Sequence, residues 1–283
     1  METLSLDEAI AGWLLPYRGG TATQYRSVLH TWLRWCELND IDPMSIRRSH
    51  LEAWGRWMSR QYANRTIATR LRIIGLFYRY LYDEHIITQD PSANVRIPTQ
   101  YAHSTGTYLT AEQAHAFLAE AEQAGVQEHA LCTLLVLAGP RIGETLKLDV
   151  DDWDREHNTV RYARKGHYEQ EVHVCEQIAQ ALDAHVGRRR HGPIFRGPSG
   201  RRMTAHRARS IVRRIGERIG LDGITPHSLR RTFCTLALDA GVPGCDVMAA
   251  GGWSNPVMLG YYDMQHRGLT QNAGGAVATL LDL

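Results

Sequence analysis

Lysine is almost absent from this sequence, although basic residues are not. The 283-residue chain has 32 basic residues, and only Lys147 and Lys165 among them are lysines. A strong arginine bias can reflect codon composition alone. Lys165, however, stands in the arginine-rich segment 161–167, which indicates a position where arginine does not serve. A lysine can give up a proton near neutral pH when its pKa is perturbed, whereas arginine effectively cannot.

Cysteine pairs, long apolar runs and metal or nucleotide motifs are also missing. The cysteines are odd in number and never form a Cys-x-x-Cys pair, so neither a disulfide framework nor a zinc site is indicated. We expect reduced, mostly buried thiols at Cys36, Cys132, Cys175, Cys234 and Cys245. With no apolar run of about eighteen residues and no signal-peptide pattern, we expect a cytoplasmic protein without membrane contact. We expect no metal or other cofactor.

Net charge gives little information, but the distribution of arginine gives more. The formal charge is only +2, yet arginines cluster at residues 188–190, 201–202, 207–209 and 213–214. Such clusters make a basic surface on a protein that is not basic overall, and Arg207 is a candidate DNA contact within them. A solvated helix face is about as good an interpretation of any single cluster.

Residues 4 to about 96 have the pattern of a helical domain. Apolar side chains recur at helical spacing after the start signal Gly19-Gly20-Thr21 and in three further segments. The predicted helices cover residues 4–15, 25–36, 49–62 and 64–81, enough for a small four-helix bundle. We interpret their Trp and Tyr stripes as core rather than as platforms for base stacking.

The length suits two domains, and the clearest boundary lies near Pro98. Pro91 and Pro98 disfavour helix, and the residues around them are small and polar. We expect a first domain at residues 1–98, a linker at 99–109 and a second domain at 110–283. The second domain starts at a capping box of Thr110 and Gln113.

The second domain is predicted to be mainly α-helical with a small antiparallel β-sheet. Helices are expected at 110–123 and 127–138, with another beginning beside Arg141. Residues 150–153, 158–163 and 169–174 alternate as strands do, and Lys165 then lies in the turn between the last two. From residue 176 the pattern is helical to the end, interrupted at 192–200.

Several residues of the second domain together suit the binding of one phosphodiester. His227 and Arg230 share one face of a helical turn, just after a proline at a predicted helix start. Arg141 and Arg230 can hold the non-bridging oxygens through forked donors. His227 can donate to the phosphate or accept a proton, and Trp253 can pack the site and donate from its indole. Taken singly, each has an ordinary structural explanation, but their order and spacing are hard to obtain by chance.

Cleavage without a metal further needs an acid and a nucleophile. Lys165, if nearby guanidinium groups lower its pKa, is the candidate acid for the departing 5′ oxygen. A tyrosine becomes a competent nucleophile when positive charge stabilises its phenolate. On the residues alone, Tyr261 and Tyr262 both qualify.

Over nearly its whole length the chain resembles the tyrosine recombinases of the phage integrase family. The matching segments are 139–146, 164–166, 225–233 and 252–262. In that family the nucleophile stands nine residues after the position of Trp253, so the resemblance selects Tyr262. It also implies an N-terminal core-binding, SAM-like domain followed by a catalytic domain. Within the first of these, Arg65 and Arg70 are candidate DNA contacts.

The resemblance implies a site-specific recombinase that acts on double-stranded DNA through a 3′-phosphotyrosyl intermediate, without metal or ATP. It also implies four protomers in the synapse, whereas accessory DNA-bending proteins stay unknown. The apolar tail, residues 276–283, is expected to dock on a neighbour or to pack within its own chain. Our first expectation is phage or mobile-element integration, without an arm-site-binding module. Xer-like chromosome-dimer resolution is the alternative.

The sequence also departs from the family's usual pattern. Trp253 replaces the commoner histidine, Arg231 stands where a second histidine is common, and Gly251-Gly252 stands where Leu-Gly is usual. A type IB topoisomerase shares the chemistry, but the short chain and the core-binding pattern argue against it. An inactive DNA-binding relative is the remaining alternative, disfavoured because all six candidate positions carry competent residues.

Overall fold

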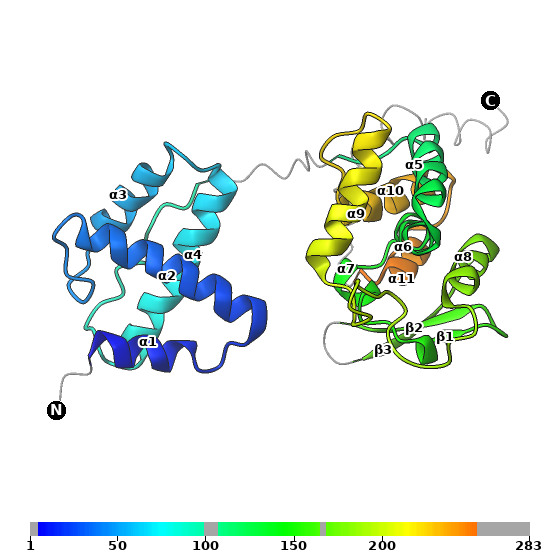
Figure 1. Cartoon of the computed structure of the whole chain (residues 1–283). Helices are drawn as coiled ribbons and strands as arrows, with labels where there is room; N and C mark the ends of the chain where they lie inside the picture. The colour runs from blue at the N-terminus through cyan, green and yellow to red at the C-terminus, as the bar shows by residue number, and fades with distance from the viewer. Residues whose placement is uncertain (1–4, 99–106, 165–167, 254–283) are drawn as a thin grey trace, which may run out of the picture. The chain divides into compact units, whose positions relative to one another are not determined.

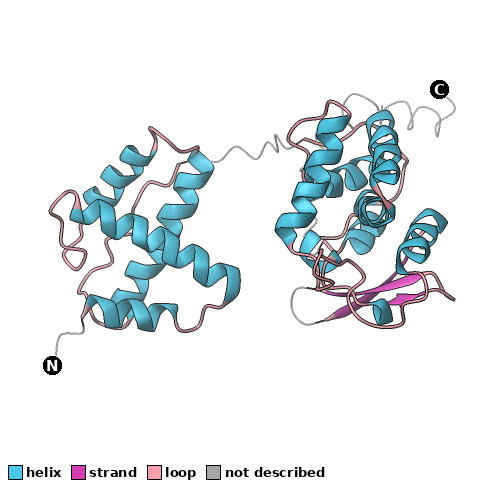
Figure 2. Ribbon diagram, viewed as in Figure 1, coloured by secondary structure: helices cyan, strands magenta, loops and turns pink. Residues whose placement is uncertain are grey.

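The computed structural model describes residues 5–98, 107–164 and 168–253. The chain splits into two compact units, here named the N-terminal unit (Met1–Ala102) and the C-terminal unit (His103–Leu283). Helices dominate both, and a small sheet lies in the C-terminal unit (Figure 1, Figure 2). The predicted fold class, mainly α-helical with a small antiparallel sheet in the second part, is confirmed. None of the helices in the described ranges combines the length and apolar character needed to cross a membrane.

The described N-terminal unit contains four helices, as the sequence predicts. They are α1 (Leu6–Leu14), α2 (Gly19–Glu37), α3 (Arg48–Met58) and α4 (Asn64–Asp83). A reciprocal capping box between Ser5 and Glu8 starts α1. The prediction for 49–62 was too long, because α3 ends at Met58. There Ser59 caps the helix, and its hydroxyl donates to the Arg56 carbonyl, in competition with helical bonding.

Aromatic side chains fill the core of the N-terminal unit. Trp32 and Trp54 are fully buried, and their rings meet edge to face with centroids 5.1 Å apart. The Trp32 indole donates to the Tyr78 hydroxyl at 2.9 Å, and that hydroxyl donates to the Pro43 carbonyl at 3.0 Å. Burial raises the pKa of Tyr78. The prediction of an aromatic core is confirmed for these residues, whereas Trp57 is 37% exposed.

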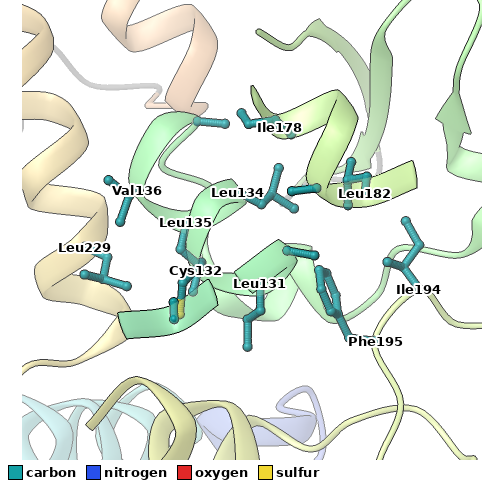
Figure 3. Close-up of a cluster of buried hydrophobic side chains, with 14 of the residues drawn as sticks. Leu131, Cys132, Leu134, Leu135, Val136, Ile178, Leu182, Ile194, Phe195 and Leu229 are labelled. Atoms are coloured by element: carbon teal, nitrogen blue, oxygen red, sulfur yellow. The ribbon is translucent and has the colours of Figure 1, made fainter. Parts of the chain in front are cut away.

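Helix α6 is the centre of the C-terminal unit. The described helices of this unit are α5 (Ala111–Ala124), α6 (Val126–Leu137), α7 (Ile142–Thr145), α8 (Glu176–Val186), α9 (Ala205–Arg218), α10 (Pro226–Asp239) and α11 (Gly244–Gly251). Seven successive residues of α6 are buried, and a helix that is apolar on all sides is stable only inside a protein. It packs against α5, α8 and α10. Figure 3 shows Leu131, Leu134 and Leu135 of α6 within this core, with Leu182 of α8 and Leu229 of α10.

The sheet contains β1 (Trp153–Asp154), β2 (Thr159–Ala163) and β3 (Glu169–His173), antiparallel in that order. The predicted strand at 150–153 was wrong, because Val150–Asp152 forms a 3₁₀ turn and only Trp153 is extended. The Asp152 carboxylate accepts the Asp149 N–H at 3.0 Å, and the Asp152 N–H donates to the Asp149 carbonyl at 2.9 Å. This local bonding competes with a strand.

The region from Glu176 is less helical than the sequence predicts. Between α8 and α9, residues 187–204 are not helical, a longer interruption than the predicted 192–200. Gly187 ends α8 with a positive φ of 57°. The Arg189 guanidinium then donates to the carbonyls of Pro193 and Ile194 at 2.8 and 3.0 Å. These bonds hold the connection in an irregular path, and local periodicity does not reveal them.

Candidate active site

Arg141 lies immediately before the short helix α7, as its sequence position indicates. It is the N-cap residue, and Glu144 holds it at both ends. The Glu144 carboxylate accepts the Arg141 backbone N–H at 3.0 Å and a guanidinium N–H at 2.8 Å. Arg141 Nη1 also donates to the Gly252 carbonyl at 3.0 Å. The Arg141 side chain is nevertheless 45% exposed, so its guanidinium is both anchored and accessible.

His227 and Arg230 lie in the first turn of α10. Thr225 caps this helix in a reciprocal box with Ser228, and Pro226 is its first residue. The predicted start, and with it the placement of both residues on one turn, is confirmed. Arg230 is buried, and its Nη1 donates to the Gly139 and Gly251 carbonyls, each at 2.6 Å. His227 is exposed at the helix start, where helix N-termini favour anions.

Trp253 follows the C-terminal end of α11 and is buried. The Arg230 guanidinium carbon lies 3.7 Å from the centroid of its ring, and Phe233 stacks nearly parallel to it, with centroids 6.4 Å apart. Trp253 therefore supplies a surface for the Arg230 guanidinium, consistent with the predicted packing role.

A tight turn at residues 251–253, which we name the α11 turn, brings both arginines together. Arg230 donates to the carbonyl of Gly251 and Arg141 to the carbonyl of Gly252. Gly252 is left-handed, with φ of 68° and ψ of 46°. A Cβ there would lie 2.6 Å from the guanidinium carbon of Arg164, so the position requires glycine for conformation and for space.

A buried ion pair that the sequence did not reveal supports this turn. The Arg164 guanidinium pairs with Glu144 at 2.7 Å, and the two side chains are 1% and 8% exposed. Gln170 accepts from Arg164 at 2.9 Å. Two features of the sequence were compatible with this ion pair, although neither residue was assigned a role. Glu144 stands three residues after Arg141, and Arg164 directly precedes Lys165.

Lys165, Tyr261 and Tyr262 lie outside the described residues, as does the tail 276–283. The two strands on either side of Lys165, β2 and β3, are paired. Next to them, the Arg164 N–H donates to the Tyr168 carbonyl at 2.9 Å. Of the six predicted site residues, the structure therefore brings together Arg141, Arg230 and Trp253 and places His227 three residues before Arg230 at the start of α10. Roles for all six stay predictions.

The three candidate DNA contacts differ in their surroundings. Arg65 is exposed in the first turn of α4. The Arg70 guanidinium stacks over the Tyr62 ring at 4.1 Å, and its buried Nη1 has no hydrogen-bond partner among the described residues. Arg207 is half-buried in the first turn of α9, where its backbone N–H donates to Thr204. Their DNA contacts remain predictions.

A metal ion or a second tyrosine near the arginines would suggest a different chemistry. Within the described ranges, no group of three or more His, Cys, Asp or Glu side chains is arranged to hold a metal ion. Tyr162 stacks beneath Arg164, with the guanidinium carbon 4.5 Å from its ring centroid. It is buried, and burial raises its pKa, so it stays neutral and inaccessible. Tyr162 is therefore no competitor for the nucleophilic role.

The fold is shared with integrases solved in complex with DNA. An integrase of transposon Tn1549, in complex with transposon right end DNA, is 18% identical with a TM-score of 0.76, and the match covers 99% of each chain. A lambda integrase dimer bound to a COC′ core site is 15% identical with a TM-score of 0.76, covering 92% of this chain and 77% of that one.

Sequence comparison gives the family. The model of the phage integrase family matches residues 107–267. Tyrosine recombinase XerC of Rhodospirillum centenum is 30% identical over 257 residues, covering 81% of this chain and 73% of the relative. XerC of Herpetosiphon aurantiacus is 27% identical over 237 residues, covering 79% and 77%. The chain belongs to the phage integrase family: it is a tyrosine recombinase, an enzyme that cleaves and rejoins DNA.

Proposed function

We propose that Tyr262 attacks a DNA phosphodiester while Arg141 and Arg230 hold its non-bridging oxygens. The Tyr262 oxygen bonds to phosphorus, the bond from phosphorus to the 5′ oxygen breaks, and Lys165 gives that oxygen a proton. The products are a 3′-phosphotyrosyl bond and a free 5′ hydroxyl. Attack by the 5′ hydroxyl of a partner duplex reverses the bond changes and frees Tyr262. Each step breaks one phosphoester bond and forms another, so the cycle needs no ATP.

The α11 turn is the observation that supports this assignment best. Both guanidinium groups donate to its carbonyls, and the candidate nucleophile follows Trp253 by nine residues. Arginines fixed in advance stabilise the developing charge without reorganisation, and one such donor is typically worth about 3 to 4 kcal/mol in the transition state. His227, exposed in the first turn of α10, adds a donor to the phosphate or accepts the phenol proton.

We further propose that residues 1–98 form a core-binding domain, 99–109 a linker and 110–283 the catalytic domain. Arg65, Arg70 and Arg207 contact DNA phosphates, and four protomers assemble on two sites. The proposed linker lies mostly outside the described residues. The DNA complexes of the Tn1549 and lambda integrases support a duplex as partner.

For the biological role, we propose integration or excision of a phage or another mobile element. The whole-chain likeness to the Tn1549 integrase and the departures at residues 251–253 and Arg231 support it. Chromosome-dimer resolution is the second candidate, favoured by the relatives named XerC and XerD.

A covalent-adduct experiment tests the proposal and identifies the DNA site at the same time. The purified full-length chain is incubated with sheared DNA of the cell that encodes it, and the reaction is stopped with denaturant. After nuclease digestion, mass spectrometry is expected to find a deoxynucleotide 3′-phosphate on Tyr262. Sequencing of the trapped DNA gives the site. A site at the ends of a mobile element supports integration, whereas a single chromosomal locus outside any element supports dimer resolution.

Two matched variants complete the test on a nicked duplex of the recovered sequence. Tyr262→Phe is expected to abolish the adduct, whereas Tyr261→Phe keeps it. An adduct on Tyr261 would overturn the assignment of the nucleophile. DNA binding without any adduct would favour the inactive relative. Lys165→Arg should slow cleavage, and a bridging 5′-phosphorothiolate at the cleavage position should restore the rate, because its 5′ sulfur leaves as a thiolate that needs no proton.

A further inference from the structure

Arg164 uses nearly every edge of its guanidinium in contacts within the C-terminal unit. Its side chain is 1% exposed. Nη1 donates to Glu144 at 2.7 Å, Nε to Gln170 at 2.9 Å and Nη2 to the Ala250 carbonyl at 3.2 Å. One face of the guanidinium lies on the Tyr162 ring. A planar fork is required for this pattern, because a lysine offers a point charge and cannot span three separate acceptors.

Each contact of Arg164 leads to a different part of the candidate site. Glu144 accepts from Arg164 at Oε2, where it also accepts the Arg141 backbone N–H, and from the Arg141 guanidinium at Oε1. Ala250 immediately precedes the α11 turn, and Gln170 adds a second bond to this helix end by donating to the Ala249 carbonyl at 2.9 Å. Arg164 is also the residue before Lys165 in the sequence. One buried guanidinium thus joins α7, the β2–β3 pair and the end of α11.

Thermodynamic stability alone explains this arrangement poorly. Removing two charges from water costs about as much as their attraction returns, so a buried ion pair is often no more stabilising than apolar residues of similar volume. What the pair does provide is orientation, since the two oxygens of Glu144 accept from Arg164 and from Arg141, and the planar fork of Arg164 also bonds Gln170 and the Ala250 carbonyl. The pair contacts Arg141 through Glu144 and the end of α11 through Ala250. The orientation of Arg164 therefore bears on the groups that we propose to hold the phosphate.

We propose that Arg164 is a positioning residue for DNA cleavage. It acts through Glu144 on the Arg141 guanidinium and through Ala250 and Gln170 on the α11 turn. This inference rests on the proposed function, because it assumes that Arg141 holds the scissile phosphate. Loss of Arg164 therefore affects the chemical step rather than DNA binding.

The test compares a phosphodiester with a methylphosphonate at the cleavage position of the nicked duplex. A methylphosphonate lacks one charged oxygen and so depends less on a correctly placed guanidinium. For Arg164→Gln and Arg164→Lys, we expect the single-turnover rate at saturating DNA to fall about 10²-fold, as for a small misplacement of a catalytic group. The DNA Kd should stay within about threefold of the unaltered protein. The methylphosphonate should recover most of the lost rate, as it should for Arg141→Ala.

Controls separate positioning from loss of structure and from failure of the proposed function. Leu182→Ala, in the core where α8 packs against α6, should lower the Tm comparably but leave cleavage below that Tm unchanged. If the Arg164 variants lose the same rate on both substrates, in proportion to their Tm, Arg164 is only structural and the inference is wrong. If Arg141→Ala cleaves like the unaltered protein, the proposed function fails instead. Should Arg164→Gln not fold, Arg164→Lys carries the same comparison.

Discussion

The two units of this recombinase differ in whether their charged side chains are buried. In residues 5–98, every buried side chain is apolar or aromatic, and the ion pairs Arg48–Glu52 and Arg79–Asp83 lie on exposed helix surfaces. In the C-terminal unit, the charged residues Glu144, Arg164, Arg230 and Arg231 are all buried.

This difference teaches what each unit contributes. The hydrophobic effect, which is non-directional, stabilises the N-terminal unit through its buried aromatic side chains. Burying a charge costs desolvation free energy, so a buried ion pair adds little stability. What it contributes is a fixed orientation of the paired side chains. In the C-terminal unit Arg230, Arg164 and Glu144 lie around the α11 turn, where we propose that two guanidinium groups hold a phosphate. Stability and cleavage should therefore respond separately to changes in the two units.

The largest effect on stability is expected for Trp32→Ala in the N-terminal unit. The change removes a fully buried ring and its hydrogen bond to Tyr78, and should lower the free energy of unfolding by about 4 kcal/mol. Urea unfolding followed by tryptophan fluorescence measures it, since most of the seven tryptophans lie in this unit. Trp57→Ala, at a 37% exposed position, is the matched control and should cost less than about 1 kcal/mol. Equal losses would contradict the aromatic-core interpretation.

Breaking the buried ion pair should be slightly less costly. Arg164→Met leaves Glu144 with Arg141 as its remaining partner, so we expect a loss of about 3 kcal/mol, at the low end for an orphaned buried charge. The double variant Glu144→Leu with Arg164→Met should regain most of that stability, because both charges are gone. Its cleavage should nevertheless stay low. Recovery of cleavage together with stability would show that the pair has no positioning role.

The sequence predicted local features well, because local interactions determine them. The helical periodicity of α2 and α4, the capping box at Thr110 and the start of α10 at Pro226 all depend on neighbours within a few residues. The strand expected at 150–153 was wrong for the same kind of reason, since the Asp149–Asp152 bonding outweighs alternation.

The support of the candidate site could not be predicted in this way. Glu144 and Arg164 are twenty residues apart, so no local pattern indicates that they pair. Because charged residues are seldom fully buried unless paired, the sequence alone predicts that both lie at the surface. The convergence of Arg141 and Arg230 on two carbonyls of the α11 turn depends on tertiary packing. Lys165 and Tyr262 lie outside the described residues, so their roles stay predictions from sequence.

A smaller effect is expected for Gly252→Ala. Alanine at a positive φ costs about 1 to 2 kcal/mol, and here its Cβ also meets the Arg164 guanidinium. Gly241→Ala is the matched control, because Gly241 has φ of +83° and nothing within 4 Å of the added Cβ. Both variants should lose similar backbone stability, but only Gly252→Ala should reduce the single-turnover cleavage rate. A cleavage defect in both would mean that backbone strain anywhere near α11 suffices.

The smallest effect is a pH dependence confined to the C-terminal unit. His185 on α8 is half-buried and bonds the Ile194 carbonyl at 2.9 Å. Burial lowers the pKa of His185, and the positive charge of Arg189 acts in the same direction, although the bond to Ile194 opposes it. The unfolded chain therefore takes up a proton at about pH 6.5 that the folded chain resists. The stabilisation is complete above that pH and is lost as the pH falls through the lower folded value.

Hydrogen exchange, corrected for intrinsic rates, can measure this dependence in each unit. Between about pH 7 and pH 5, protection of the α8 peptide should fall more than that of α4, which contains no histidine. His185→Gln should remove the difference, because glutamine keeps a hydrogen-bond donor for Ile194 and does not titrate. If the slope for α8 persists in His185→Gln, another group carries it.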